Sequence, residues 1–255
     1  MPLEIVTVPC RTDNYAYLVH DSDSGETALV DIPEAQPILD TLDSRGWTLS
    51  QIWITHHHPD HVEGLSGVLE RHPAPVTGGR DDAHRLPPLD RQVAEGDTLE
   101  IAGHEGHVID VSGHTVGHLA FHFPTMQAAF TADSLMAWGC GRVFEGSMDM
   151  MHVSLEKLAA LPPETQIYSG HEYTTANGKF ALSIEPDNPA LISRMKEVEA
   201  ARADNRPTVP VPLSLELETN PFLRADTPQV RAAVGLPDAP ASEVFAAVRM
   251  RKDNF

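Results

Sequence analysis

The chain has 255 residues, 41% of them hydrophobic and 22% charged, which is enough apolar content for a buried core and excludes a disordered chain. It carries 37 acidic and 18 basic residues, and the net charge of -19 argues against nucleic acid or an anionic membrane as a partner. Two cysteines are too few for a disulfide framework. The sequence shows no signal peptide, membrane span or long hydrophobic stripe, so we expect a soluble cytoplasmic monomer.

Short β-type runs separated by polar turns dominate the first two-thirds of the chain. Helical spacing appears only at 35–47, which has a glycine near its end, and at 62–72. The pattern therefore predicts a β-rich α/β body. The predicted strands are 3–9, 15–21, 27–32, 51–55, 98–103, 106–113, 119–125, 127–133 and 166–170.

After residue 174 the predicted elements are mainly helices, and proline-rich segments connect them. The segment 187–206 begins with Asp/Asn capping residues and with Pro189 in the first turn, which predicts a helix. The segment 227–236 begins in the same way, with a threonine followed by a proline. A last helix is predicted at 242–255, and 208–222 is expected to be extended. We therefore expect two domains, 1–174 and 175–255.

Four histidines and one aspartate fall within six positions directly after the predicted strand 51–55. Side chains alternate along an extended segment, so the first and third histidines should lie on one side and the second on the other. Imidazole and carboxylate suit zinc, iron and similar metals, whereas a surface polyhistidine tract would not follow a buried strand. The candidate ligands are His56, His58, Asp60 and His61, the last two at the start of the next helix, while His57 points away.

Three further candidates follow other predicted strands, whose ends can converge in space. Seven ligands suit two metal ions with one bridging carboxylate, because a catalytic site keeps a position open. We assign His56, His58 and His114 to one ion, Asp60, His61 and His171 to the other, and Asp133 to both. His118 is expected to support the ligands from behind. The other histidines are expected to be structural or surface residues: His20, His72, His84, His104, His107, His122 and His152.

These motifs resemble the metallo-β-lactamase superfamily: THHHPDH matches its HxHxDH signature, and GHTVGH, TAD and GHEY match its other ligand positions. The implied fold is a four-layered αββα sandwich with the metals at one edge of the two sheets. From residue 14 to residue 255 the chain is also similar to glyoxalase II, the hydroxyacylglutathione hydrolases. The segments that carry this similarity are DNYAYLV, FTADSLMAWGCGRVFEGS, SGHEYTTANGKFALSIEPDNPAL, LETNPF and RMRKDNF.

The resemblance implies a catalytic domain at 1–174 and a helical glutathione-binding domain at 175–255. It implies that the substrate contacts Arg142, Phe144, Tyr173, Arg249 and Lys252, the last two through its glycine carboxylate. Near the end of this very acidic chain, three cations lie within four residues: Arg249, Arg251 and Lys252. Such a group is suited to binding a carboxylate. Cations at a helix C-terminus also favour the helix dipole, and the residues alone do not separate these two interpretations.

Two positions depart from the family pattern. Phe144 stands where many members have tyrosine, and loss of one neutral hydrogen bond should weaken binding by about 1 kcal/mol. Ala132 replaces the glycine of the usual TGD, which requires the backbone there to avoid positive φ.

The implied reaction is hydrolysis of S-D-lactoylglutathione and related 2-hydroxyacyl thioesters at two divalent ions, zinc first, with iron or manganese also suited to these ligands. Asp60 and Asp133 would orient the attacking hydroxide, and neither Cys10 nor Cys140 is placed to act as a nucleophile. Other interpretations are a lactonase or β-lactamase of the same fold, a glutathione persulfide dioxygenase, and a non-enzymatic glutathione- or metal-binding protein.

Overall fold

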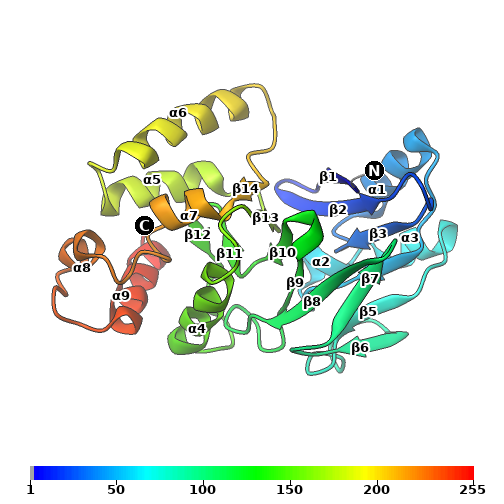
Figure 1. Cartoon of the computed structure of the whole chain (residues 1–255), viewed down its shortest axis with the longest axis horizontal. Coiled ribbons are helices and arrows are strands. Elements are labelled where there is room, and N and C mark those ends of the chain that lie inside the picture. Colours follow the sequence, from blue (N-terminus) through cyan, green and yellow to red (C-terminus); the bar gives the residue numbers. More distant parts are fainter. Residues whose placement is uncertain (1–2) are drawn as a thin grey trace. The chain divides into compact units, whose positions relative to one another are not determined.

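The chain packs as two units, and the computed structural model describes residues 3–255 (Figure 1). The first unit holds the described residues up to Asp110 together with Val116–Phe130, and the second holds Val111–Thr115 and Thr131–Phe255. The first two residues of the predicted domain 1–174 lie outside the described residues.

The first unit is built on a six-stranded sheet in the order β1-β2-β3-β4-β5-β6. The first three strands pair antiparallel and the last three join in parallel. The two strands β5 and β6 are too short and too interrupted by glycine and polar residues to stand out in the sequence, and they were not predicted. The strands are β1 Glu4–Cys10, β2 Asn14–His20, β3 Thr27–Val30, β4 Gln51–Trp53, β5 Val76–Gly79 and β6 Arg91–Val93.

A second run of antiparallel strands in this unit lies against the first sheet. The Trp53 ring stacks on the Phe123 ring at 5.2 Å, and Tyr17 packs on Phe130 at 5.7 Å. These aromatic contacts join the inner faces of the two layers, as in a sheet sandwich. The strands are β7 Thr98–Ile101, β8 His104–Asp110, β9 Leu119–Phe123 and β10 Ala128–Ala132, with a short 3-10 helix η1 at Pro124–Met126.

Helices α1 (Ala35–Arg45) and α3 (Leu65–Arg71) pack on the β1–β6 sheet through a cluster that includes Ile38, Leu42 and Ile52. The predicted helix 62–72 is confirmed as α3 over Leu65–Arg71, but its predicted start is wrong, because Val62 ends a separate short helix, α2 (Pro59–Val62). The backbone of Gly64 donates to the Ile32 carbonyl, and a Cβ there would meet the Ala35 nitrogen at 2.8 Å. This close approach of two backbones interrupts the helix.

The second unit contains a short hairpin, the strands β13 and β14, and six helices among its described residues. The hairpin packs against helices α5 and α6 through Trp138, Ala181 and Met195. The elements are β11 Leu135–Met136, β12 Gly139–Cys140, α4 Met148–Ala159, β13 Gln166–Ser169, α5 Thr174–Ile184, α6 Pro189–Ala203, β14 Val211–Pro212, α7 Leu213–Thr219, α8 Pro228–Val234 and α9 Ala241–Asp253.

The predicted helix caps are confirmed. The side chain of Asn188 accepts from the backbone of Ala190 and Leu191, and Thr227 accepts from Val230, with a proline at the start of each helix. Across residues 3–255, the structure has no helix that combines the length and apolarity needed to cross a membrane.

The prediction that 208–222 is extended is wrong beyond Pro212, because α7 occupies Leu213–Thr219. The face that the helix buries is partly polar, since Glu216 and Thr219 are fully buried beside Leu213. Because the charged Glu216 occupies a position where a helix usually buries an apolar residue, the sequence does not show the apolar spacing typical of a helix.

Candidate metal centre

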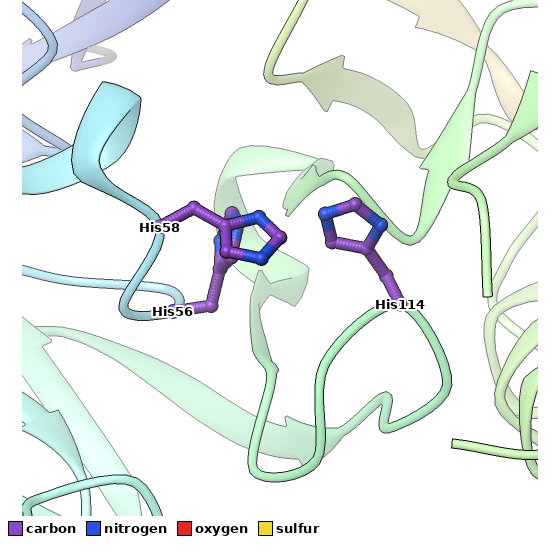
Figure 2. Close-up of side chains that lie close together, drawn as sticks. All are labelled: His56, His58 and His114. Atoms are coloured by element: carbon purple, nitrogen blue, oxygen red, sulfur yellow. The ribbon is translucent and has the colours of Figure 1, made fainter. Parts of the chain in front are cut away.

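The histidine segment of the first unit continues the line of β4. Its backbone stays paired, because Ile54 donates to the Thr77 carbonyl and Thr55 accepts from Leu119. The rings of His56 and His58 stand edge to face with centroids 4.8 Å apart (Figure 2). The segment thus presents alternate imidazoles together, as the strand period predicts.

The intervening His57 is engaged elsewhere. Its Nδ1 lies 2.9 Å from the Asp82 carboxylate, which is fully buried. His118 is also fully buried, and its ring stacks on His56 at 4.5 Å. Both observations agree with the roles expected for these two histidines, one outside the ligand set and one supporting it.

Asp60 and His61 lie in the first turn of α2, as predicted. The His61 Nε2 lies 3.9 Å from the Asp60 Oδ2. Asn14 donates from Nδ2 to both the backbone oxygen and the Oδ2 of Asp60, each at 3.0 Å. This amide fixes the Asp60 carboxylate beside the imidazole.

A residue that sequence reasoning missed, Asp31, orients two of the histidines. Its Oδ2 lies 2.8 Å from the His61 Nδ1 and accepts the Thr55 hydroxyl at 2.8 Å. Because that hydroxyl donates to Asp31, it accepts from the His56 Nδ1, which lies 3.0 Å away. Both rings therefore carry their proton on Nδ1 and present an Nε2 lone pair, the form that binds a metal.

The available signal for Asp31 was its place near the end of the predicted strand 27–32, since Asp133 was also identified at the end of a strand. Asp31, His56 and His61 form one group of potential ligand atoms within 4.8 Å of one another. Since the Asp31 carboxylate is already occupied by Thr55 and His61, its role is to hold ligands.

In the second unit, one carboxylate oxygen lies between two imidazoles. The Oδ2 of Asp133 is 3.4 Å from the His114 Nε2 and 3.3 Å from the His171 Nε2. The His114 Nδ1 donates to the Arg142 carbonyl at 2.7 Å, so the Nε2 of this ring is the lone-pair nitrogen. A carboxylate oxygen facing such a nitrogen needs a cation, and a divalent metal ion suits this donor set.

The residue before Asp133 contradicts an expectation. Ala132 has φ 40, in the left-handed region, so the prediction that its backbone avoids positive φ is wrong. Its carbonyl accepts from Gly170 at 2.9 Å, which ties the end of β10 to the segment of His171. The turn that presents Asp133 keeps its shape and tolerates a methyl group where glycine is easier.

The residues proposed to contact substrate lie in this same unit, and two of them touch metal-ligand candidates. Tyr173 stacks on the His171 ring at 4.7 Å and is 39% exposed. Phe144 meets the edge of the His114 ring at 5.4 Å and is 61% exposed. The exposed aromatics therefore flank the two imidazoles.

The three basic residues predicted to bind substrate, Arg142, Arg249 and Lys252, differ in their surroundings. Arg249 is buried, and its guanidinium donates to the Cys140 carbonyl at 2.8 Å and to the Asp253 carboxylate at 2.9 Å. Arg142 is half-exposed and meets the same Asp253 oxygen at 3.2 Å. Lys252 lies over the Phe180 ring at 5.3 Å, and burial lowers the pKa of its ammonium group. Sequence reasoning gave Asp253 no role, although it ends the quoted RMRKD motif.

Neither cysteine is suited to nucleophilic attack. Burial raises the pKa of the Cys10 thiol to about 12 and that of the Cys140 thiol to about 11. At neutral pH both stay protonated, and only the thiolate is nucleophilic. This agrees with the expectation that no side chain of the protein attacks the substrate.

A cavity of about 790 Å³ lies elsewhere in the second unit. None of the predicted site residues lines it, so it is not the candidate site. Its lining residues are Ile184, Glu185, Pro186, Asp187, Asn188, Pro189, Ala190, Glu218, Arg224, Gln229, Ala232 and Ala233.

Two family models together match most of the chain. The metallo-beta-lactamase superfamily model matches residues 12–171, and the model described as hydroxyacylglutathione hydrolase C-terminus matches residues 172–255. A Ruegeria pomeroyi protein named hydroxyacylglutathione hydrolase is 60% identical over 255 residues, covering 100% of both chains. A Cereibacter sphaeroides protein of the same name is 59% identical with the same coverage.

Solved structures show the fold. BLEG-1, a B3 metallo-beta-lactamase, superposes with a TM-score of 0.67 at 19% identity, covering 86% of this chain and 99% of its own. ETHE1 from Myxococcus xanthus superposes with a TM-score of 0.66 at 22% identity, covering 99% and 98%. The predicted αββα metallo-β-lactamase fold with a C-terminal helical domain is confirmed, and with its His/Asp groups it indicates a divalent metal centre. The chain belongs to the hydroxyacylglutathione hydrolase family of the metallo-β-lactamase superfamily.

Proposed function

We propose that this chain hydrolyses S-D-lactoylglutathione and other S-2-hydroxyacylglutathiones to glutathione and the 2-hydroxy acid, the second step of methylglyoxal detoxification. Its full-length similarity to hydroxyacylglutathione hydrolases supports this. The observation that carries the proposal is the position of the Asp133 carboxylate between two imidazoles, each flanked by an exposed aromatic side chain. Metal ligands and substrate contacts are then built from the same segments.

Two divalent ions per chain, zinc first with iron or manganese as alternatives, would be held by the seven predicted ligands. His56, His58 and His114 would hold one ion, Asp60, His61 and His171 would hold the other, and Asp133 would be a ligand shared by both. The hydrogen bonds from the His61 Nδ1 to Asp31 and from the His114 Nδ1 to the Arg142 carbonyl support this assignment. Each leaves the Nε2 lone pair of its ring available to a metal ion.

Such ions, when bound, lower the pKa of water toward 7 and act as Lewis acids on a carbonyl oxygen. The protein contributes orientation: Asn14 fixes the Asp60 carboxylate, and Asp133 is fixed by the strand end that carries it. With the ions bound, these two carboxylates would orient the attacking hydroxide toward the thioester carbonyl. Glutathione leaves as a thiolate, which is a good leaving group because a thiol has a pKa near 8.5.

Glutathione would be held by Arg142, Tyr173 and the C-terminal helix, with Arg249 and Lys252 facing its glycine carboxylate and Phe144 packing on it. In this proposal residues 1–174 form the catalytic domain and also supply Arg142, Phe144 and Tyr173, while the glutathione-binding domain 175–255 supplies Arg249 and Lys252. The cluster of Arg142, Arg249 and Lys252 gives a very acidic chain the local positive charge that an anionic thioester needs. A cytoplasmic monomer with no nucleic-acid or membrane partner completes the proposal.

The test is release of free thiol from S-D-lactoylglutathione, with metal content measured by elemental analysis on the same sample. Rapid turnover with close to two metals per chain is the expected result. An acyl-homoserine lactone, a β-lactam and glutathione persulfide are assayed in parallel. Turnover of one of these, with no thiol release at full metal occupancy, would overturn the proposal.

A further inference from the structure

Two guanidinium groups converge on one carboxylate at the end of the C-terminal helix. The Asp253 Oδ1 accepts from the Arg249 Nη2 at 2.9 Å and from the Arg142 Nε at 3.2 Å. The Arg142 Nη2 also reaches the Asp253 backbone oxygen at 3.4 Å. The two arginines come from positions 107 residues apart (249 minus 142), so a single carboxylate links the loop after β12 to helix α9.

Two of the three Arg249 guanidinium nitrogens are bonded within the protein, and the third, the buried Nε, has no hydrogen-bond partner among the described residues. The Arg249 Nη1 donates to the Cys140 carbonyl at 2.8 Å, the guanidinium face covers the Phe222 ring, and the side chain is 6% exposed. The donor edge that an incoming carboxylate would use is therefore the edge that Asp253 occupies. Arg142 is different, because its side chain is 53% exposed and its contacts to Asp253 are at the surface.

We infer that Asp253 is a specificity-determining residue, an internal carboxylate that competes with the terminal carboxylate of the substrate for Arg142 and Arg249. This rests on the proposed function. The Arg142–Asp253 contact is a surface ion pair, which is weak enough to be displaced, and a second anion placed beside Asp253 is repelled by it. Asp253 thus lowers affinity for anionic substrates and products, and favours release.

The test replaces Asp253 with asparagine, which removes the charge and keeps an acceptor oxygen for both arginines. For S-D-lactoylglutathione, Asp253→Asn should lower KM by about three- to fivefold while kcat stays within about twofold. For the same thioester built on glutathione glycinamide, which lacks the terminal carboxylate, KM should not change. The matched control is Asp238→Asn, which makes the same charge change at an exposed site of the same unit.

Calorimetric binding of free glutathione provides a readout that does not depend on turnover. Asp253→Asn should tighten it about three- to fivefold, and Asp253→Glu, which restores the charge, should not. Thermal unfolding of each variant checks that it folds, and Asp253→Ser replaces the asparagine variant if that one does not.

A raised or unchanged KM and glutathione affinity in Asp253→Asn would overturn the inference, as would an equal decrease in KM for the carboxylate and glycinamide substrates. These outcomes are separate from failure of the proposed function, which would appear as absence of thiol release by the unmodified protein.

Discussion

The carboxylate of Glu216 lies 2.6 Å from the guanidinium of Arg194, and the two side chains are 0% and 6% exposed. Glu216 also accepts from the Trp138 backbone at 2.8 Å and from the Asn220 amide at 2.9 Å. Asn220 in turn donates to the carbonyls of Met136 and Gly139. The β11–β12 hairpin, which lies between Asp133 and Arg142, is therefore held to Glu216 of α7 and to Asn220 by hydrogen bonds, and the buried ion pair joins α7 to α6.

Breaking this pair should destabilise the protein strongly. Arg194→Met leaves a buried carboxylate without its partner, and we expect the free energy of unfolding to fall by about 3–5 kcal/mol. The double variant Arg194→Met/Glu216→Leu should lose less than the sum of the single changes, because neither charge remains buried. Urea unfolding measures both. The exposed pair of Arg206 and Asp204 is the control, and Asp204→Asn should change stability by less than about 1 kcal/mol.

Ala132→Gly should stabilise the protein, because glycine adopts the φ of 40 at this position without the Cβ clash that alanine has. The expected gain in the free energy of unfolding is about 1 kcal/mol. Thermal unfolding gives the measurement. Ala129→Gly, in the same strand at a position with ordinary φ, should destabilise, and a gain in stability there would discredit the backbone argument.

His122 should make stability depend on pH. Burial, followed by the nearby charge of His107, lowers the pKa of the folded His122 below its ordinary value of 6.5. Below pH 6.5 the unfolded chain takes up the proton more readily than the folded one, so the free energy of unfolding falls as the pH drops, and above that pH this contribution is constant. Urea midpoints between pH 5 and 8 should show a smaller decrease in His122→Gln than in the unmodified protein. Identical curves would contradict the assignment.

Asp31→Asn should weaken metal binding without touching a metal ligand. The amide can still accept from Thr55, but the carboxylate that holds the His61 Nδ1–H is lost. Changes of this kind typically reduce metal affinity by about 10–100-fold. Competition with a chelator measures the affinity. His107→Gln serves as the matched control, because this histidine lies on β8 outside the predicted ligand set and should leave the affinity unchanged.

Phe144→Tyr should lower KM for S-D-lactoylglutathione. The ring is 61% exposed beside His114, so a hydroxyl group there can reach a bound ligand. One neutral hydrogen bond of about 1 kcal/mol corresponds to about a fivefold change. Steady-state kinetics gives the comparison, and Phe255→Tyr, at an exposed position of the same unit, is the control. If both variants behave alike, the hydroxyl at position 144 contributes no specific contact.

The sequence was informative where a pattern is local. The strand period separated His57 from its neighbours, and the caps Asn188 and Thr227 were recognisable because capping involves residues only two or three apart. The α/β class followed from the succession of short strands and helices.

What could not be predicted depends on partners that are distant in sequence. Glu216 was predicted to lie in an extended segment, because Arg194, which makes its burial in a helix possible, belongs to another helix. Asp31 and Asp253 gained their roles only when His61 and Arg142 were brought beside them. The signal for the positive φ of Ala132 was the glycine usual at this position in the resembling family, but alanine rarely adopts this conformation, so the residue itself indicated the opposite.

The hydrogen bond from the His114 Nδ1 to the Arg142 carbonyl joins a metal-ligand candidate to the backbone of a substrate-binding candidate. A ligand that shifts one end of this bond changes the energy of the other. By thermodynamic reciprocity, any factor by which metal loading tightens glutathione binding must equal the factor by which glutathione tightens metal binding. The protein would then retain its metal best while it is saturated with thioester, and would lose it most readily in cells depleted of glutathione.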